Sequence, residues 1–124
     1  MRPTVLLFDI DGTLLTCGGA GQRAMRRAFD GLYRAPDACR FPYAGRTDRG
    51  ILRQALRRAG QPAGEAQVLR AAGAYLAHLR RELPASEGFR VLAGARDLLR
   101  ALPAGPTRAV GLGTGNLAAG AALK

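Results

Sequence analysis

Long apolar runs and cysteine are both scarce in this sequence of 124 residues. No apolar run approaches the roughly 20 residues that cross a bilayer, so we expect no transmembrane helix. The first residues also lack the apolar stretch and small-residue cleavage site of a secretory signal. The only two cysteines, Cys17 and Cys39, have no neighbours of metal-ligand type. This cysteine usage predicts reduced thiols and a cytoplasmic protein.

Acidic residues and lysine are scarce as well. The sequence has 9 Asp and Glu but 19 Lys and Arg, which gives a net charge of +10, and Lys124 is the only lysine. A basic balance can indicate a nucleic-acid or anionic partner. The arginines, however, are spread along every segment and do not gather with aromatic residues into a stacking platform. We therefore predict a solvated arginine-rich surface and no nucleic-acid partner.

The residues that are abundant indicate an α/β chain, since 48% of them are hydrophobic. Apolar runs at residues 4–9 and 107–114 predict strands of a parallel sheet, buried under helices on both faces. Residues 88–92 are a weaker strand candidate. Residues 35–46 contain two prolines and predict a loop. Apolar residues at helical spacing predict helices at 20–34, 48–59, 64–83, 95–102 and from Asn116 onward.

Local signals mark the ends of two of these helices. Thr47 is a predicted N-cap for helix 48–59, and Gly60 closes that helix. Pro84 is expected to end helix 64–83, because proline lacks an N–H and clashes with the preceding turn. The expected inward face of this last helix consists of Val68, Leu69, Ala72, Tyr75, Leu76 and Leu79.

The stretch "LLFDIDGTLL", residues 6–15, carries the main chemical signal. Asp9 and Asp11 lie two residues apart at a strand end, so their side chains point to the same side. Two such carboxylates repel, and a divalent cation with oxygen ligands, Mg²⁺, removes that repulsion. One carboxylate can then attack phosphorus while the other transfers a proton. Gly12 permits close backbone approach, and Thr13 offers a hydroxyl and an N–H to phosphate oxygens.

Two other interpretations of the glycine and aspartate pattern fit less well. A calcium-binding EF-hand loop starting at Asp9 would need glycine at its sixth position and glutamate at its twelfth, where Leu14 and Ala20 stand. Around residues 110–118, "VGLGTGNLA" satisfies the G-x-G-x-x-A pattern of a dinucleotide-binding loop. That pattern also requires an acidic residue about 20 positions further on, and it leaves "DIDGT" unexplained.

The motif "FDIDGTLL" resembles the D-x-D-G-T-[LV] signature of the haloacid dehalogenase (HAD) superfamily. "YAGRTDRGIL" and "VLAGARDLLRAL" resemble segments of its phosphoglycolate-phosphatase-like members, and "GLGTGN" is similar to the second motif of the superfamily. The resemblance implies an α/β fold with a Rossmann-like core. Residues 1–16 and 89–124 would form part of that core, and residues 17–88 would form a helical cap inserted after the first strand.

The resemblance also implies roles for individual residues in an Mg²⁺-dependent phosphatase for a small phosphorylated metabolite. Asp9 would be the nucleophile and a metal ligand. Asp11 would be the general acid and base and would bind the metal through its backbone carbonyl. Thr114 would hydrogen-bond the transferring phosphoryl group, with Gly115 and Asn116 shaping the turn and the following helix N-terminus favouring phosphate.

Two basic residues have open roles. Arg46 would contact a substrate anion from the cap loop, or would instead anchor that loop. Lys124 would balance the phosphate charge, or would instead be an exposed residue at the end of the last helix.

The resemblance is incomplete, because the ten residues after Thr114 include no acid that could complete a metal site. We therefore expect an N-terminal fragment of a larger fold with little or no turnover. The alternative function is a non-catalytic basic protein that binds anions or nucleic acid and retains an inactive HAD site.

Overall fold

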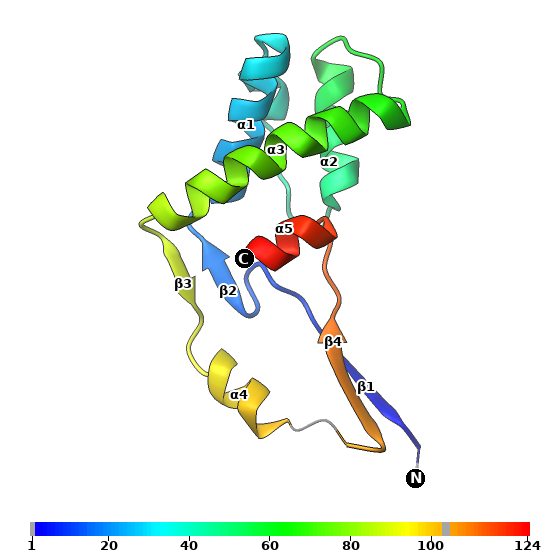
Figure 1. Ribbon diagram of the computed structural model, residues 1–124, viewed down its shortest axis with the longest axis vertical. Coiled ribbons are helices and arrows are strands. Elements are labelled where there is room, and N and C mark those ends of the chain that lie inside the picture. The colour runs from blue at the N-terminus through cyan, green and yellow to red at the C-terminus, as the bar shows by residue number, and fades with distance from the viewer. Residues whose placement is uncertain (1, 103–104) are drawn as a thin grey trace.

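The computed structural model describes residues 2–102 and 105–124 and shows a mixed α/β chain (Figure 1). In those ranges no helix is both long and apolar enough to cross a membrane. The elements in chain order are β1 (Thr4–Phe8), β2 (Leu15–Cys17), α1 (Ala20–Tyr33), the 3₁₀ helix η1 (Pro36–Cys39), α2 (Asp48–Arg58), α3 (Glu65–Ala85), β3 (Phe89–Val91), α4 (Ala95–Ala101), β4 (Arg108–Leu112) and α5 (Ala118–Leu123).

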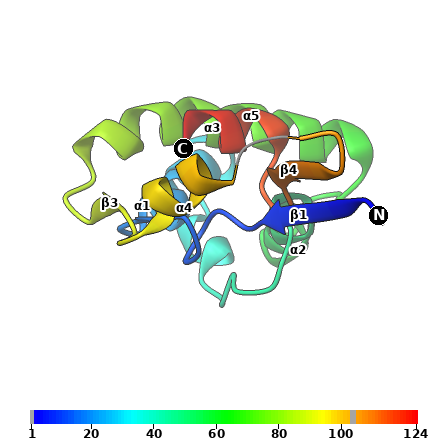
Figure 2. The same cartoon turned by 90° about the horizontal axis from the view of Figure 1, so that it is seen from below.

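The first and last strands form a parallel pair, as the sequence predicted. β1 pairs with β4 in a register that joins Thr4 to Arg108 and Phe8 to Leu112. Seen from below, these two strands lie side by side while α5 lies along α3 (Figure 2). β3, the weaker strand candidate, is also present, but it pairs antiparallel with β2. The sequence did not predict β2, whose three residues directly follow the turn of the aspartate motif.

The predicted burial of the parallel strands is wrong. Val5 is 64% exposed, Leu7 is 66% exposed and Leu112 is 56% exposed. Parallel strands lose contact with water only when helices cover both faces of a sheet of several strands. Within the described part of the chain, the sheet that contains β1 has only β4 as a second strand. Apolar side chains of both strands therefore face solvent.

The hydrophobic core lies instead among the three long helices. Figure 1 shows α3 crossing α1 and α2 above the strands. The apolar face of each helix points into this helical block, which we define as residues 20–85. Its largest fully buried side chains are Met25, Phe29, Leu52, Leu56, Val68, Tyr75 and Leu79. Burial of these side chains is the main stabilising contribution of the block.

Two expectations for the longest helix are wrong in detail. Leu69 is 58% exposed, although the sequence placed it on the inward face. The buried face follows Val68, Tyr75 and Leu79, and Leu69 is rotated from it by about 100°, the angle of one helical residue. The helix also continues through Pro84 to Ala85. Proline in the last turn removes only one hydrogen bond, so the helix can include Pro84 before it ends.

The predicted N-cap of α2 is confirmed. The Thr47 hydroxyl oxygen accepts a hydrogen bond from the Gly50 N–H at 3.1 Å. Gly60 follows the helix with a φ of 69°, which suits glycine. The predicted loop before this helix is less irregular than expected, because it contains η1. The other helix bounds agree with the sequence predictions to within two residues.

Replacing this cap gives a direct test of local stability. We expect Thr47→Ala to lower the free energy of unfolding by about 1 kcal/mol, because the Gly50 N–H loses its acceptor. Thr47→Ser keeps the hydroxyl and should stay close to the parent. Chemical denaturation measures both variants, and equal stability of Thr47→Ala and Thr47→Ser would show that the cap contributes nothing.

Candidate active site

One cavity, of about 590 Å³, brings together most of the residues that the sequence singled out. It lies where the loops after β1 and β4 meet the loop before α2. Its lining consists of Asp9, Asp11, Ala44, Gly45, Arg46, Thr47, Asp48, Gly113, Thr114, Gly115 and Asn116. Six of the predicted site residues are therefore neighbours here: Asp9, Asp11, Arg46, Thr114, Gly115 and Asn116.

The parallel strand pair explains this convergence. The carboxyl ends of parallel strands meet at one edge of a sheet, where ligands bind in open α/β folds. Asp9 directly follows β1, and Thr114 follows β4 by two residues. The Gly113 N–H donates to the Phe8 carbonyl at 2.8 Å and extends the strand pairing up to the cavity. This strand pairing brings together segments that are about 100 residues apart in the sequence.

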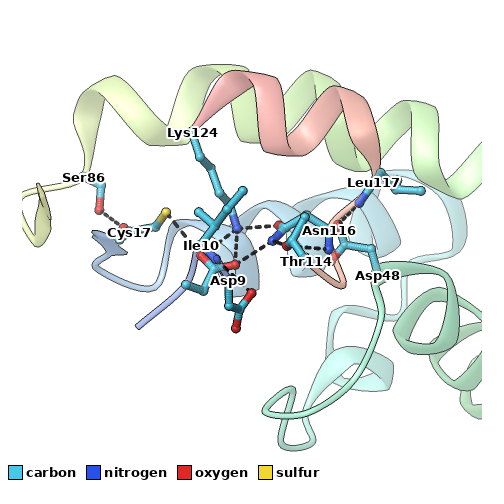
Figure 3. Close-up of polar contacts among 10 residues, drawn as sticks. Asp9, Ile10, Cys17, Asp48, Ser86, Thr114, Asn116, Leu117 and Lys124 are labelled. Atoms are coloured by element: carbon cyan, nitrogen blue, oxygen red, sulfur yellow. Dashed lines mark hydrogen bonds and ion pairs between the residues drawn. The ribbon is translucent and has the colours of Figure 1, made fainter. Parts of the chain in front are cut away.

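Asp9 is exposed at the cavity, as a nucleophile requires. Its Oδ1 accepts a hydrogen bond from the Ile10 N–H at 2.8 Å. The other carboxylate oxygen, Oδ2, has no hydrogen-bond partner among the described residues. Figure 3 shows the side chain beside the polar cluster around Asn116.

Asp11 belongs to a tight polar network with the loop after β4. The Asn116 amide nitrogen donates to Asp11 Oδ2 at 2.8 Å and to Thr114 Oγ1 at 2.6 Å. The Lys124 ammonium lies 2.8 Å from both Asp11 carboxylate oxygens and 2.6 Å from Asn116 Oδ1. One aspartate, one amide, one hydroxyl and one ammonium group thus hold each other in place.

The Lys124 side chain lies inside the polar network and is shielded from solvent. It is only 5% exposed, so the prediction of an exposed residue at the helix end is wrong. Side chains on a helix lean toward its N-terminus. From the end of α5 the long Lys124 side chain therefore extends back to Asn116, at the beginning of the same segment. A role in balancing phosphate charge stays a prediction.

The network changes the acidity of Asp11. Partial burial alone would raise the pKa of the Asp11 carboxyl. Hydrogen bonds from Lys124 and Asn116, together with the Lys124 charge, outweigh burial and hold that pKa below its usual value. The carboxylate form of Asp11 is therefore favoured in the protein without substrate.

Removing the ammonium group should raise the pKa of Asp11. We expect Lys124→Met to show a higher pKa in a ¹³C NMR titration of the Asp11 carboxyl, whereas Lys124→Arg keeps a cation there. A lowered folded-state pKa stabilises the protein above the unfolded value of about 3.9, and this contribution is lost as pH falls through the folded value. The stability difference between parent and Lys124→Met should therefore be present at pH 7 and shrink in acid. Identical Asp11 titrations would refute the ion pair.

Gly12 and Thr13 lie outside the cavity lining. Gly12 adopts a φ of 79° and donates its N–H to the Leu15 carbonyl at 2.8 Å, while the Thr13 N–H donates to the Ile10 carbonyl at 3.2 Å. These bonds form a tight turn between β1 and β2. The predicted contact of the two residues with phosphate stays a prediction.

Arg46 has contacts that fit both of its predicted roles. Its guanidinium lies 5.3 Å from the centre of the Phe41 ring, and its Nη1 donates to Gln54 Oε1. Arg58 lies over the same ring at 5.5 Å. Such cation–π stacking anchors the loop before α2. Because Arg46 also lines the cavity, its anchored positive charge is close to any anion that enters.

Asp48 is a site residue that the sequence analysis missed. It lines the cavity and is only 8% exposed, which is unusual for a carboxylate. Burial raises the pKa of the Asp48 carboxyl, against the lowering effect of a hydrogen bond from the Leu117 N–H. Its only sequence signal was an acid in the first turn of a predicted helix, which is common for any helix.

Both cysteines are free and buried, as expected for reduced thiols. Cys17 lies closest to the site, with its Sγ 3.7 Å from Asp11 Oδ1. Burial raises the pKa of the Cys17 thiol, so the neutral form is favoured. Cys17 is therefore a packed thiol beside the site rather than an activated nucleophile.

The oxygen donors present suit Mg²⁺, which proteins often bind through one or two carboxylates, waters and substrate phosphate. Since Lys124 holds the Asp11 carboxylate, the available donors are the Asp9 carboxylate and the Asp11 backbone carbonyl. Residues 2–102 and 105–124 contain no group of three or more His, Cys, Asp or Glu that could hold a metal. The described chain therefore offers a divalent cation only these two donors at this place.

Comparison with known proteins adds no relative: no protein-family model and no curated protein sequence matches this chain. The functional interpretation therefore depends on the residues at the strand ends.

Proposed function

We propose that this chain is a HAD-like hydrolase, an Mg²⁺-dependent phosphatase that cleaves a small phosphomonoester through an aspartyl-phosphate at Asp9. The observation that carries the proposal is the meeting of Asp9, Asp11 and Thr114 at the carboxyl ends of two parallel strands. In this proposal residues 1–16 and 89–124 belong to a Rossmann-like core. Residues 17–88, which include the helical block, form the cap.

The first chemical step uses the exposed carboxylate. Asp9 attacks phosphorus, a new O–P bond forms, and the ester O–P bond breaks as the leaving oxygen takes a proton from Asp11. In the second step Asp11 removes a proton from water, whose oxygen attacks phosphorus. The O–P bond to Asp9 then breaks, which releases phosphate and restores the Asp9 carboxylate. When bound, Mg²⁺ supplies positive charge that reduces repulsion between the carboxylates and the phosphate.

The residues around the two aspartates orient the phosphoryl group and adjust its charge. In this proposal the Thr114 hydroxyl, whose oxygen accepts a hydrogen bond from the Asn116 side-chain amide, donates to a phosphoryl oxygen. Without substrate, Lys124 keeps Asp11 ionised, which suits the second step. An incoming phosphate competes for the Lys124 ammonium. Movement of Lys124 away from Asp11 would raise the pKa of that carboxyl, which favours the proton transfer of the first step. Arg46 supplies positive charge from the opposite loop.

The donor set also predicts a low rate. Of the three acids at the cavity, Asp11 pairs with Lys124 and Asp48 accepts from the Leu117 N–H. The chain therefore holds Mg²⁺ weakly, and we propose slow turnover. The free, buried thiols of Cys17 and Cys39 support a reducing, cytoplasmic location for the protein.

The ion pairs of the helical block support a small-molecule partner over nucleic acid. A nucleic-acid surface needs basic side chains that are free to reach phosphates along one face. Several arginines here pair with acids of neighbouring helices instead: Arg23 and Arg27 with Glu82, and Arg49 and Arg53 with Glu65.

Hydrolysis of p-nitrophenyl phosphate tests the proposed function. We expect slow release of p-nitrophenol with Mg²⁺ and none above background with a chelator. Asp9→Asn, purified in the same way, is the control for contaminating phosphatase, because release that persists in it does not come from the proposed nucleophile. Release that is equal with Mg²⁺ and with chelator would contradict the metal dependence, and no release at any Mg²⁺ concentration would contradict the proposal.

A further inference from the structure

We propose that Asp48 is a positioning residue that fixes Asn116, and with it Thr114, at the mouth of the cavity. This inference rests on the proposed function for its consequence in phosphate binding. Its structural part concerns only how the helical block holds the loop between β4 and α5.

Two hydrogen bonds from one residue bracket Asn116. The Asp48 N–H donates to the Gly115 carbonyl at 2.8 Å. The Asp48 Oδ2 accepts from the Leu117 N–H at 2.9 Å. The backbone is therefore held on both sides of Asn116, and Figure 3 shows Asp48 next to Leu117. This double attachment leaves the Asn116 side chain little freedom of direction.

Close backbone packing strengthens the attachment. A Cβ atom on Gly115 would lie 2.7 Å from the Arg46 carbonyl oxygen and 3.2 Å from Thr47 Cα. The loop before α2 and the loop after β4 thus touch with no side chain between them. Further along, Gly120 of α5 packs near Leu76, Leu79 and Asp48 Oδ2. Asp48 is the polar residue at the centre of this contact.

Asn116 links Asp48 to the groups proposed to react. Its amide nitrogen contacts both Asp11 and Thr114, and its amide oxygen accepts from Lys124. A shift of the Asn116 backbone would misplace all three groups together. Asp48 itself need not touch the substrate, so it differs in role from Asp9 and Asp11.

Asp48→Ala, Asp48→Asn and the matched control Glu82→Gln separate positioning from general stability. Asn keeps an oxygen that accepts from Leu117, whereas Ala does not. Glu82 is a similarly shielded carboxylate, 12% exposed, which pairs with Arg23 away from the cavity. The first measurement is the ¹⁵N–¹H NMR position of the Asn116 side-chain amide and the Leu117 backbone amide. We expect both to shift in Asp48→Ala, to shift less in Asp48→Asn, and to stay unchanged in Glu82→Gln.

The second measurement is binding of inorganic phosphate with Mg²⁺, by calorimetry. We expect Asp48→Ala to weaken binding about tenfold, comparable to loss of one hydrogen bond to a charged group, and Asp48→Asn to restore most of it. In an Asn116→Ala background the further effect of Asp48→Ala should disappear, because a positioning residue acts through its target.

Either of two results would overturn the inference. One is an NMR position of the Asn116 side-chain amide that does not change in folded Asp48→Ala. If the alanine variant does not fold, the corresponding result is a position that is unchanged in both Asp48→Asn and Glu82→Gln. The other is fully additive losses in the double variant. If the parent does not bind phosphate, the proposed function fails, and the NMR comparison still decides the role of Asp48.

Discussion

Asp9→Asn is expected to reduce Mg²⁺-dependent hydrolysis of p-nitrophenyl phosphate at least about a hundredfold, to the uncatalysed background. An amide cannot attack phosphorus and form the aspartyl-phosphate. The change should leave the fold intact, because Asp9 is exposed and an amide oxygen can still accept from the Ile10 N–H. Initial rates at saturating substrate measure the effect.

Asp97→Asn is the matched control for that variant. It makes the same substitution at an exposed aspartate on α4 and should keep the parent rate. Circular dichroism should show both variants folded. Turnover by Asp9→Asn at the parent rate would exclude Asp9 as the nucleophile.

Leu79→Ala is expected to give the largest loss of stability, about 2–5 kcal/mol in the free energy of unfolding. Leu79 is 0% exposed between α3 and its neighbours, so its removal leaves a cavity in the helical block. The net stability of a small domain is only about 5–15 kcal/mol, so this loss is a large part of the total. Urea denaturation followed by circular dichroism measures it.

Leu69→Ala is the control on the same helix. Leu69 is 58% exposed, so the same substitution should change stability by no more than about 0.5 kcal/mol. Equal losses in the two variants would contradict the helix orientation described here, and with it the placement of the core.

The sequence predicted those features that depend on local chemistry. Helical spacing of apolar residues located α1, α2 and α3, and the Thr47 hydroxyl marked a helix start. In each case the physical cause lies within a few neighbouring residues. That Asp9 and Thr114 serve one site was expected from the resemblance alone, and the two residues do line the same cavity.

Other features depend on contacts between distant segments, and the sequence could not predict them. The pairing of β2 with β3 joins two short strands without a strong pattern of their own. The return of Lys124 to Asp11 depends on where α5 packs against α3. The burial of Asp48 depends on the contact between two loops at Gly115. The exposure of Val5 and Leu7 depends on how many strands accompany β1.

Direct detection of a phosphoenzyme is the most decisive test of Asp9 as the nucleophile. The protein is mixed with Mg²⁺ and p-nitrophenyl phosphate, quenched in acid and examined by peptide mass spectrometry. We expect a phosphoryl group on the peptide that contains Asp9, at that residue, and none in Asp9→Asn. A phosphoryl group on another residue, or hydrolysis without any covalent phosphoenzyme, would contradict it.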